Sequence, residues 1–372
     1  MTAEPMRLFL SGDVMTGRGI DQIQETPGSP ALYEPWAKSA IRYVEIAERR
    51  HGAIPRLVNP HYVWGDALGV LDESEVDARI INLETAVTNR GQPWPAKGIH
   101  YRMHPLNVAV LEAADVDCCV LANNHVLDWS YAGLSQTLDS LHDAGIFTAG
   151  AGADARDSRR PAVIETHSGS RVVVLAVGMQ SSGIPASWSA AGDRAGVWLL
   201  RSLTNDAIKD IGDELSRVRR PGDVTIVSIH WGPNWGYAIP PGHRRFAQAL
   251  IDEAGVDIVH GHSSHHPIGI EIYHNRLILY GCGDLINDYE GIGGHDEFRP
   301  GLGALYLVTF THAGLKELEM IPMRLRRFRL QLSEREDVSW LAWALTRASR
   351  PFGTKFEDVG DGRLRASCDL ER

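Results

Sequence analysis

The stretch Asp257-Ile-Val-His-Gly-His-Ser-Ser-His-His-Pro267 places four of the sixteen histidines of the chain within seven residues, directly after an apolar run. Imidazole is the commonest neutral metal ligand, and its ordinary pKa lies nearest to physiological pH. A cluster of histidines at the end of a strand therefore indicates a metal site or a site of proton transfer. The plainer alternative is a polar loop whose histidines cap turns, and it fits a single histidine better than the whole cluster.

The composition of the 372 residues is that of a globular protein, with 44% hydrophobic and 23% charged residues. This length allows two or three domains, or one large α/β unit. The formal net charge of -10 disfavours nucleic acid or an anionic membrane as the principal partner, because both bind basic surfaces.

The cysteines and the first residues of the chain bear on its location. Cys118, Cys119, Cys282 and Cys368 form no C-x-x-C pair, so we expect small buried residues rather than a disulfide framework or a zinc site. The first ten residues contain no basic region followed by a long apolar segment. We therefore expect no signal peptide, no membrane anchor and a cytoplasmic location.

Short apolar runs that end in Gly, Asp, Asn or His alternate with longer segments of helical spacing. The runs are residues 7–10, 78–83, 116–122, 171–177, 223–229, 256–259 and 277–280, and the helical segments include 133–144, 205–218 and 244–254. Strands that alternate with helices predict an α/β fold. In such sheets the chemistry collects in the loops beyond the carboxyl ends of the strands.

The pattern changes after about Gly301, where a strand over 305–310, a basic segment Arg324–Arg329 and a helix near 338–349 are expected. We predict a main domain of residues 1–310 and a C-terminal extension of residues 311–372 packed on it.

Five motifs at strand ends carry oxygen or imidazole donors, and together they are far more specific than any one of them. They are Ser11-Gly-Asp13-Val-Met-Thr-Gly-Arg18, Ile81-Asn82-Leu-Glu84-Thr85, Leu121-Ala-Asn123-Asn124-His125-Val-Leu-Asp128, Ser228-Ile-His230-Trp231-Gly232 and the histidine loop. When each strand ends in a donor residue, donors from separate strands can converge on one site.

The chain resembles the CapA-like family, the capsule and poly-γ-glutamate accessory proteins that have a calcineurin-type metallophosphoesterase fold. The resemblance runs from about Leu8 to Tyr306 through GDVMTGRGID, INLETAVT, YRMHP, LANNHVLDWSYAGL, HWGPNWGY, HGHSSHHP and LYGCGDLINDYEG. It implies a calcineurin-like four-layer α/β/β/α sandwich with the active site at one edge.

The resemblance also implies a set of site residues. The implied metal ligands are Asp13, Glu84, Asn124, His230, His262 and His265. In that superfamily such residues hold two divalent ions, which polarise a phosphate and generate hydroxide. The histidine after the asparagine, here His125, stabilises the reacting group or protonates it.

Three departures from the superfamily pattern weaken the implied site. Asp13 is followed by Val14 and Met15, so the Asp-x-His pair is absent, and a lone Glu84 replaces the bridging acid. Ser263-Ser264 also lengthens the spacing between histidines. Because ligand geometry governs metal retention, the sequence predicts at most a weakly bound divalent ion. No organic cofactor is expected.

His295 lies in a glycine-rich segment that could carry a catalytic histidine over a pocket, as a general acid or base opposite Asp13 or His125. The alternative is a surface histidine in a turn. Arg18 and Arg102 could grip a carboxylate or phosphate, or they could form structural salt bridges.

Trp231 and Trp235, separated by Gly-Pro-Asn, offer flat apolar surfaces beside His230. This spacing suits an exposed binding wall better than an interior, although core packing explains part of the pattern.

Three functions remain open from the sequence. The favoured interpretation is a cytoplasmic enzyme that epimerises a Cα of a ribosomally made, lasso-type precursor peptide, because the family resembled includes such proteins. Asp13 or His125 would then exchange the Cα proton with His295 on the opposite face. The alternatives are a divalent-metal-dependent phosphoester hydrolase and an accessory protein for capsule or poly-γ-glutamate synthesis. The expected partner is a peptide substrate, with no nucleic acid and no membrane.

Overall fold

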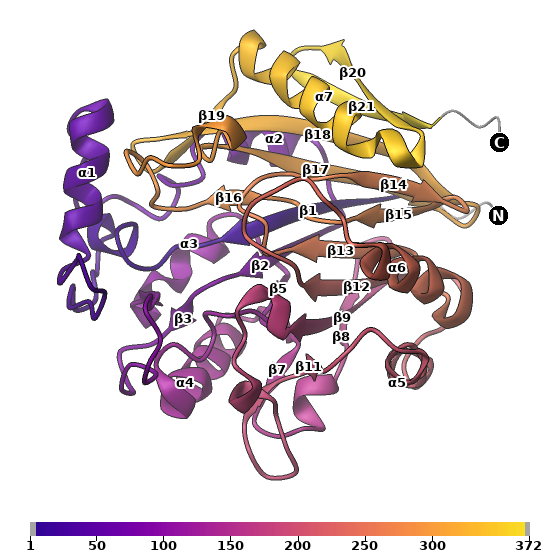
Figure 1. Cartoon of the computed structure of the whole chain (residues 1–372), viewed down its shortest axis with the longest axis horizontal. Coiled ribbons are helices and arrows are strands. Elements are labelled where there is room, and N and C mark those ends of the chain that lie inside the picture. The colour runs from indigo at the N-terminus through magenta and orange to yellow at the C-terminus, as the bar shows by residue number, and fades with distance from the viewer. Residues whose placement is uncertain (1–4, 369–372) are drawn as a thin grey trace.

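Two β-sheets form the centre of the protein (Figure 1), whose computed structural model describes residues 5–368. The larger sheet has ten strands. In spatial order these are β20 (Thr354–Gly360), β21 (Arg363–Cys368), β18 (Gly314–Arg326), β17 (Leu302–Thr311), β1 (Met6–Val14), β2 (Ala78–Leu83), β5 (Cys118–Val120) and β6 (Phe147–Ala149), with β16 (Asp284–Ile286) on β1 and β19 (Arg329–Leu332) on β18.

The smaller sheet has seven strands. In spatial order these are β11 (Leu199–Leu200), β9 (Arg171–Met179), β12 (Val224–His230), β13 (Ile258–His262), β15 (Arg276–Leu279) and β14 (Ile270–Tyr273), with β8 (Ala162–Glu165) on β9. Two short ribbons pair β3 (Ala86–Val87) with β4 (Arg102–Met103) and β7 (Ala151–Gly152) with β10 (Gly196–Val197).

Alternation along β9 shows how the smaller sheet is packed. Val172 and Val174 belong to the core that is shared with the larger sheet, whereas Val173 and Leu175 belong to a second core. Because successive side chains point to opposite faces of a sheet, the two cores lie on its two sides. The helices α5 (Asn205–Ser216) and α6 (Pro241–Ala254) supply the second core and cover that face (Figure 1).

The remaining helices lie along the larger sheet and at its ends. They are α1 (Ile41–His51), α2 (Asp66–Glu73), α3 (Ala109–Glu112), α4 (Ser130–Asp143) and α7 (Arg335–Ser349). Short 3-10 turns cover Asp21–Ile23, Pro105–Val108, Asp157–Arg159, Gln180–Ser182, Ala186–Trp188, Asp296–Phe298 and Arg350–Phe352. The expected α/β class is confirmed, and no helix within residues 5–368 is long and apolar enough to cross a bilayer.

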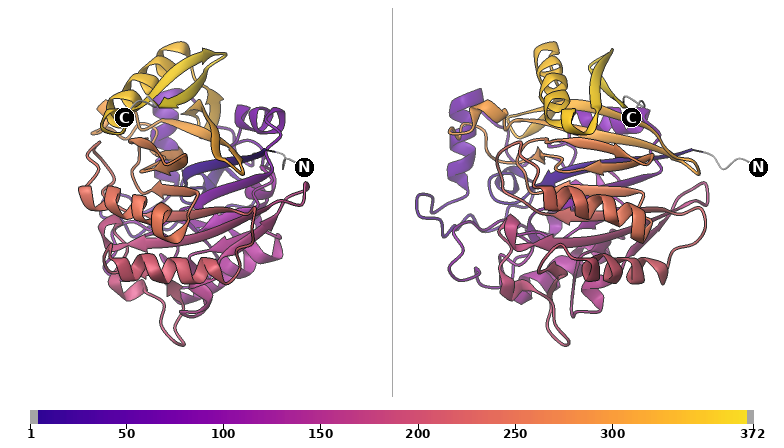
Figure 2. Two further views of the ribbon diagram at one scale, coloured as in Figure 1. Left: turned by 90° about the vertical axis from the view of Figure 1, so that its right-hand side faces the viewer. Right: turned by 45° about the vertical axis from the view of Figure 1, so that its right-hand side comes forward.

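The C-terminal elements continue the larger sheet. β17 and β18 pair across residue 310, and β20, β21 and α7 (yellow) lie together at one side of the strands in both views of Figure 2. The division of the chain at residue 310 stays a prediction. Cys118, Cys119 and Cys282 are buried and Cys368 is partly exposed, and all four are free thiols.

The parallel strands direct their carboxyl ends to one edge. β1, β2 and β5 are parallel in the larger sheet, as are β9, β12 and β13 in the smaller one. A Cβ atom on Gly12 would lie 1.8 Å from the carbonyl oxygen of Gly283, so only glycine permits this approach of β1 to the chain before β16. The approach brings Asp13 into register with Asp284.

Arg18, just beyond β1, ties three segments together from a buried position. Its Nε and Nη2 donate to the carboxylate of Asp288, at 2.8 and 2.5 Å. Its remaining N–H groups donate to Glu34 at 3.0 Å, to the Tyr43 hydroxyl at 2.8 Å and to the Tyr101 hydroxyl at 2.5 Å. All five donors of the guanidinium are therefore used inside the protein.

Replacing Arg18 with methionine should lower the free energy of unfolding by about 3–5 kcal/mol, because Asp288 and Glu34 would be left as buried charges without a cation. The matched control is Arg42→Met, whose ion pair with Glu45 is half exposed and should contribute less than about 1 kcal/mol. Urea denaturation measures both, and equal losses would contradict the role given to Arg18.

Candidate metal centre

Asp13 is the common member of two groups of donor atoms at the carboxyl ends of the strands. One group is Asp13, His230 and His262, and the other is Asp13, His265 and Asp284. Within each group the donor atoms lie within 4.8 Å of one another, and all five residues are buried. The register explains this arrangement, since Asp13 stands between Asn82 of β2 and Asp284 of β16.

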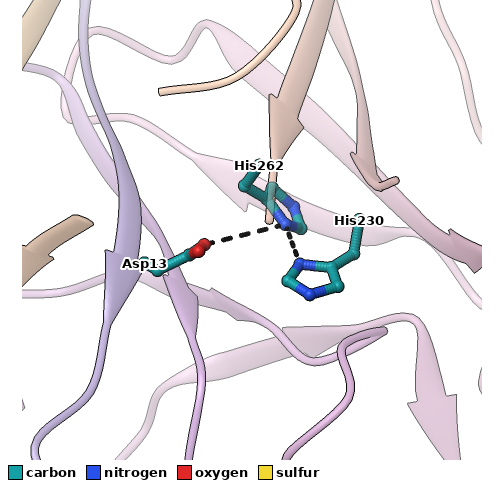
Figure 3. A group of neighbouring side chains, drawn as sticks. All are labelled: Asp13, His230 and His262. Atoms are coloured by element: carbon teal, nitrogen blue, oxygen red, sulfur yellow. Dashed lines mark hydrogen bonds and ion pairs between the residues drawn. The ribbon is translucent and has the colours of Figure 1, made fainter. Parts of the chain in front are cut away.

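The first group is shown in Figure 3, where dashed lines join the Asp13 carboxylate to His262 and His262 to His230. His230 and His262 are register partners on the parallel strands β12 and β13, so their side chains leave the sheet on the same side. Their Nδ1 atoms are 2.7 Å apart, and Nδ1 of His262 is 4.0 Å from Oδ1 of Asp13.

Hydrogen bonds outside the group orient these two rings. Oδ1 of Asn124 lies 3.0 Å from Nε2 of His230, and because this oxygen can only accept, Nε2 carries the proton and Nδ1 presents its lone pair. The Ser228 hydroxyl lies 2.7 Å from Nε2 of His262. Burial lowers the pKa of both histidines well below the ordinary value, so both are neutral, which is the form that binds a metal.

The second group is built by the histidine loop and β16. Nδ1 of His265 lies 2.8 Å from Oδ1 of Asp284, and the amide of Asn234 lies 2.9 Å from its Nε2. Burial acts to lower the pKa of His265, but the charges of Asp284 and Asp13 outweigh it and the pKa is raised. Ser263 has a φ of 102°, a strained value for a residue with a side chain, and the turn there precedes His265.

The other two histidines of the loop bond to the backbone. Nε2 of His260 donates to the carbonyl of Ser11 at 2.7 Å, which joins β13 to β1 across the two sheets. Nε2 of His266 accepts from the N–H of Gly236 at 3.1 Å. These roles leave His262 and His265 as the members of the loop beside Asp13.

Three buried carboxyl groups face the same small volume. The pKa of Asp13 is raised to about 7 by burial and by the charge of Asp284, and that of Glu84 is raised well above its ordinary value by burial and by Asp13. Oδ2 of Asp13 and Oε2 of Glu84 have no hydrogen-bond partner among residues 5–368. Carboxylates this close cannot all ionise unless a positive charge lies between them.

These residues fit divalent cations, one in each of the two donor groups. Carboxylate oxygens without a hydrogen-bond partner and imidazole nitrogens are donors that such ions take. The residues that would hold the cations are Asp13, Glu84, Asp284, His230, His262 and His265, with Asn124 beside His230. The Asp-x-His pair is absent and the histidine spacing is longer than in the superfamily. Asp284 adds a carboxylate to the remaining donors.

His125 stands next to this donor set with a carboxylate behind it. Its Nδ1 lies 2.6 Å from Oδ2 of Asp128, and its Nε2 lies 3.7 Å from Oε1 of Glu84. Asp128 is also paired with Lys97 at 2.6 Å. Burial and the charge of Lys97 lower the pKa of His125 to about 4, so the ring is neutral at pH 7. A neutral histidine oriented by a carboxylate is suited to moving a proton at Nε2.

Asp284 and Asn82 were missed by sequence reasoning. Cys282-Gly283-Asp284 follows an apolar run as Ser11-Gly12-Asp13 does, and this repeat was the available signal. Asn82 donates to Oδ1 of Asp13 at 2.7 Å and accepts from Asn123 at 3.0 Å. Asn123 in turn accepts from the backbone N–H of His125 at 3.1 Å, so two buried amides fix Asp13 and His125 together.

His295 and Trp235 lie beyond the histidine loop. The half-buried ring of Trp235 is stacked on His295 with centroids 4.0 Å apart, and it lies 5.4 Å from the ring of His265. Trp235 therefore forms a wall beside the second donor group. In residues 5–368 the ring contacts of His295 are with Trp235 and Phe298, and none joins it to Asp13 or His125.

Trp231 is not part of an exposed wall, which corrects the prediction made for it. Its ring is 3% exposed, is stacked on His243 and donates from Nε1 to the carbonyl of Tyr280 at 2.9 Å. Apolar packing in the second core accounts for it.

The two arginines predicted to grip a substrate are engaged elsewhere. Arg18 has no free donor, so a substrate could be held only by displacing an internal partner. Arg102 lies with its guanidinium 3.7 Å from the ring centroid of Trp129 and donates to the carbonyl of Ser29 at 3.2 Å.

The sequence pattern of the family described as "Bacterial capsule synthesis protein PGA_cap" matches residues 7–289. The protein belongs to this family. A probable polyglutamine synthesis accessory protein of Mycobacterium tuberculosis is 49% identical over 360 residues, which cover 96% of this chain and 94% of that protein. The expected CapA-like family is thereby confirmed.

Two Bacillus proteins are more distant relatives. The PGA biosynthesis protein CapA of Bacillus subtilis is 24% identical over 279 residues, covering 74% of this chain and 62% of that protein. The capsule biosynthesis protein CapA of Bacillus anthracis is 24% identical over 289 residues, covering 77% and 60%. The chain thus spans about three fifths of the length of these two relatives.

Asp13 should make the effect of a divalent cation on stability depend on pH. The raised pKa means that Asp13 in the metal-free protein stabilises the fold below about pH 4, and that this contribution is lost as the pH rises through about 7. A cation needs the ionised carboxylate, so Mn²⁺ should raise the melting temperature more at about pH 8 than at about pH 5.5. Calorimetry of Asp13→Asn should show little increase at either pH, and an unchanged increase would contradict the assignment.

Asn82→Ala should weaken Mn²⁺ binding by about 10–100-fold, because the amide that orients a ligand is lost while the ligand remains. Isothermal titration of the metal-free protein measures this, with the exposed Asn205→Ala on α5 as the control. Equal affinities for the two variants would show that Asn82 does not position Asp13.

Proposed function

We propose that this protein is a divalent-metal-dependent phosphoester hydrolase with an accessory role in making a polymer of glutamate or glutamine. The observation that carries the proposal is the buried Asp13 carboxylate, shared between two groups of metal-type donors with His125 beside them. The polymer is inferred from the names of the relatives, which are capsule, PGA and polyglutamine synthesis proteins.

We further infer that the two sheets and the helices around them form the four-layer α/β/β/α sandwich of calcineurin-type metallophosphoesterases. Support comes from the face-to-face packing of the sheets in a shared core and from α5 and α6 on the outer face of one of them. The apolar residues that α2 and α4 add to the shared core also support it, as does the position of the donors at the carboxyl ends of parallel strands.

Divalent cations bound by these donors would polarise a phosphate oxygen and lower the pKa of a water molecule. Around them, the chain holds its groups in fixed positions. Asn82 orients the Asp13 carboxylate, and Asn124 keeps the proton of His230 on Nε2. Nε2 of the neutral His125 would accept a proton from the attacking water molecule, and Asp128 would stabilise the imidazolium that forms. The Trp235 ring offers an apolar surface next to His265.

Cα epimerisation of a peptide, the function favoured from the sequence, gains no support from the relatives, whose names concern polymer and capsule synthesis. Its chemistry needs a second acid or base across the pocket. The sequence indicates His295 for this role. In the structure its ring is stacked on Trp235 rather than in contact with Asp13 or His125. The predicted lasso-type peptide substrate and the cytoplasmic location stay predictions.

With Mn²⁺ bound, the protein should hydrolyse bis(p-nitrophenyl) phosphate, and EDTA should abolish the activity. His125→Asn should lower kcat by about 10²–10⁴-fold while the bound Mn²⁺ stays unchanged, because the ring moves a proton and is outside the donor groups. The control is His274→Asn. His274 is exposed, lies on the turn between β14 and β15 and is paired with Asp252. A kcat within about threefold of wild type in His125→Asn would remove this residue from the mechanism.

The same protein incubated with peptides in D₂O separates the two enzyme classes. Deuterium appearing at a Cα, with no release of nitrophenol, would replace hydrolysis by proton transfer as the function of the site.

A further inference from the structure

A cavity of about 860 Å³ adjoins the candidate metal centre. Its walls come from the end of α1, the segment after β16, the β18–β19 hairpin and the start of α7. These elements are far apart in the sequence, and the cavity includes part of the basic segment Arg324–Arg329, which the metal centre does not use.

One layer of side chains separates this cavity from the metal donors. Asn287 lines the cavity, and its amide donates to Oδ2 of Asp284 at 2.9 Å. Tyr289 also lines the cavity, and its ring meets that of His265 edge-on with centroids 5.3 Å apart. A ligand in the cavity therefore lies against residues that touch the second donor group.

Two arginines in the wall have no acidic side chain within ion-pair distance among residues 5–368. Arg50 at the end of α1 and Arg326 at the end of β18 are exposed, and neither forms an ion pair within residues 5–368. By contrast, Arg299 and Arg324 of the same cavity are both paired with Asp337. The unpaired guanidinium groups are free to bind a carboxylate.

We propose that this cavity binds a chain of amino-acid residues with free carboxylates, which Arg50 and Arg326 hold. Asp296 and Glu334 on the rim form no ion pair among residues 5–368, and they disfavour a ligand that carries phosphates alone because such a ligand offers them no hydrogen-bond donor. A glutamyl chain supplies both carboxylates and N–H groups. Its identity as the polymer of this family's biosynthesis rests on the proposed function.

The test is the binding of a fluorescein-labelled pentaglutamate to the metal-free protein, followed by fluorescence anisotropy in EDTA. Arg50→Ala and Arg326→Ala should each raise Kd by about tenfold, because each removes a charged hydrogen-bond donor. Arg217→Ala, in which the exposed arginine that follows α5 loses its pair with Glu214, should leave Kd unchanged. A labelled pentaglutamine, which lacks side-chain carboxylates, should bind more weakly than pentaglutamate.

Equal Kd values for wild type, Arg50→Ala and Arg326→Ala would overturn the proposal, as would equal binding of pentaglutamine. Asp13→Asn should bind pentaglutamate as tightly as wild type, because Asp13 does not line the cavity. The binding test therefore stands apart from the proposed hydrolysis. Loss of binding in the arginine variants supports the cavity even if no phosphoester is cleaved, and hydrolysis without any pentaglutamate binding refutes the cavity alone.

Discussion

The close approach of buried carboxyl groups around Asp13 is the constraint on which the rest of the site depends. Asp13, Glu84 and Asp284 lie where water is excluded, and the pKa values of Asp13 and Glu84 are raised by burial and by their neighbours. The fold maintains this unfavourable arrangement by several devices. Gly12 and Gly283 allow the chains to touch, and Asn82 donates to the Asp13 carboxylate. A cation bound between the ionised carboxylates would offset their repulsion.

The two sheets contribute different ligand types to this point. The larger sheet supplies the carboxylates from β1, β16 and the end of β2, and the smaller sheet supplies the imidazoles of His230 and His262 from β12 and β13. The bond from His260 to the carbonyl of Ser11 fixes the sheets to each other a few residues away. Packing between the sheets therefore sets the geometry of the donors, and the C-terminal strands extend the same structure to the cavity at Arg326.

Periodicity and strand ends made most of the architecture predictable from the sequence. The apolar runs over 78–83 and 223–229 coincide with β2 and β12, and the expected helix near 338–349 coincides with α7. The order of the donor motifs was also readable, because parallel strands present their carboxyl ends at one edge.

Features that depend on pairing between distant segments could not be predicted. Asp284 joins the donors only because β16 pairs with β1. Arg18 forms ion pairs with Glu34 and Asp288, which come from two other segments. The longer spacing between His262 and His265 counted against a metal site in the sequence. The strained backbone at Ser263 lies within this spacing. Trp231 is buried rather than exposed, and its neighbours in the sequence do not reveal this.

The most direct test of the central claim is electron paramagnetic resonance of the metal-free protein titrated with Mn²⁺. Because Asp13 belongs to both donor groups, ions bound in the two groups would share its carboxylate, and we predict the spectrum of a magnetically coupled pair. Asp13→Asn should abolish that spectrum. Isolated Mn²⁺ signals that are the same in wild type and in Asp13→Asn would contradict a centre organised around this residue.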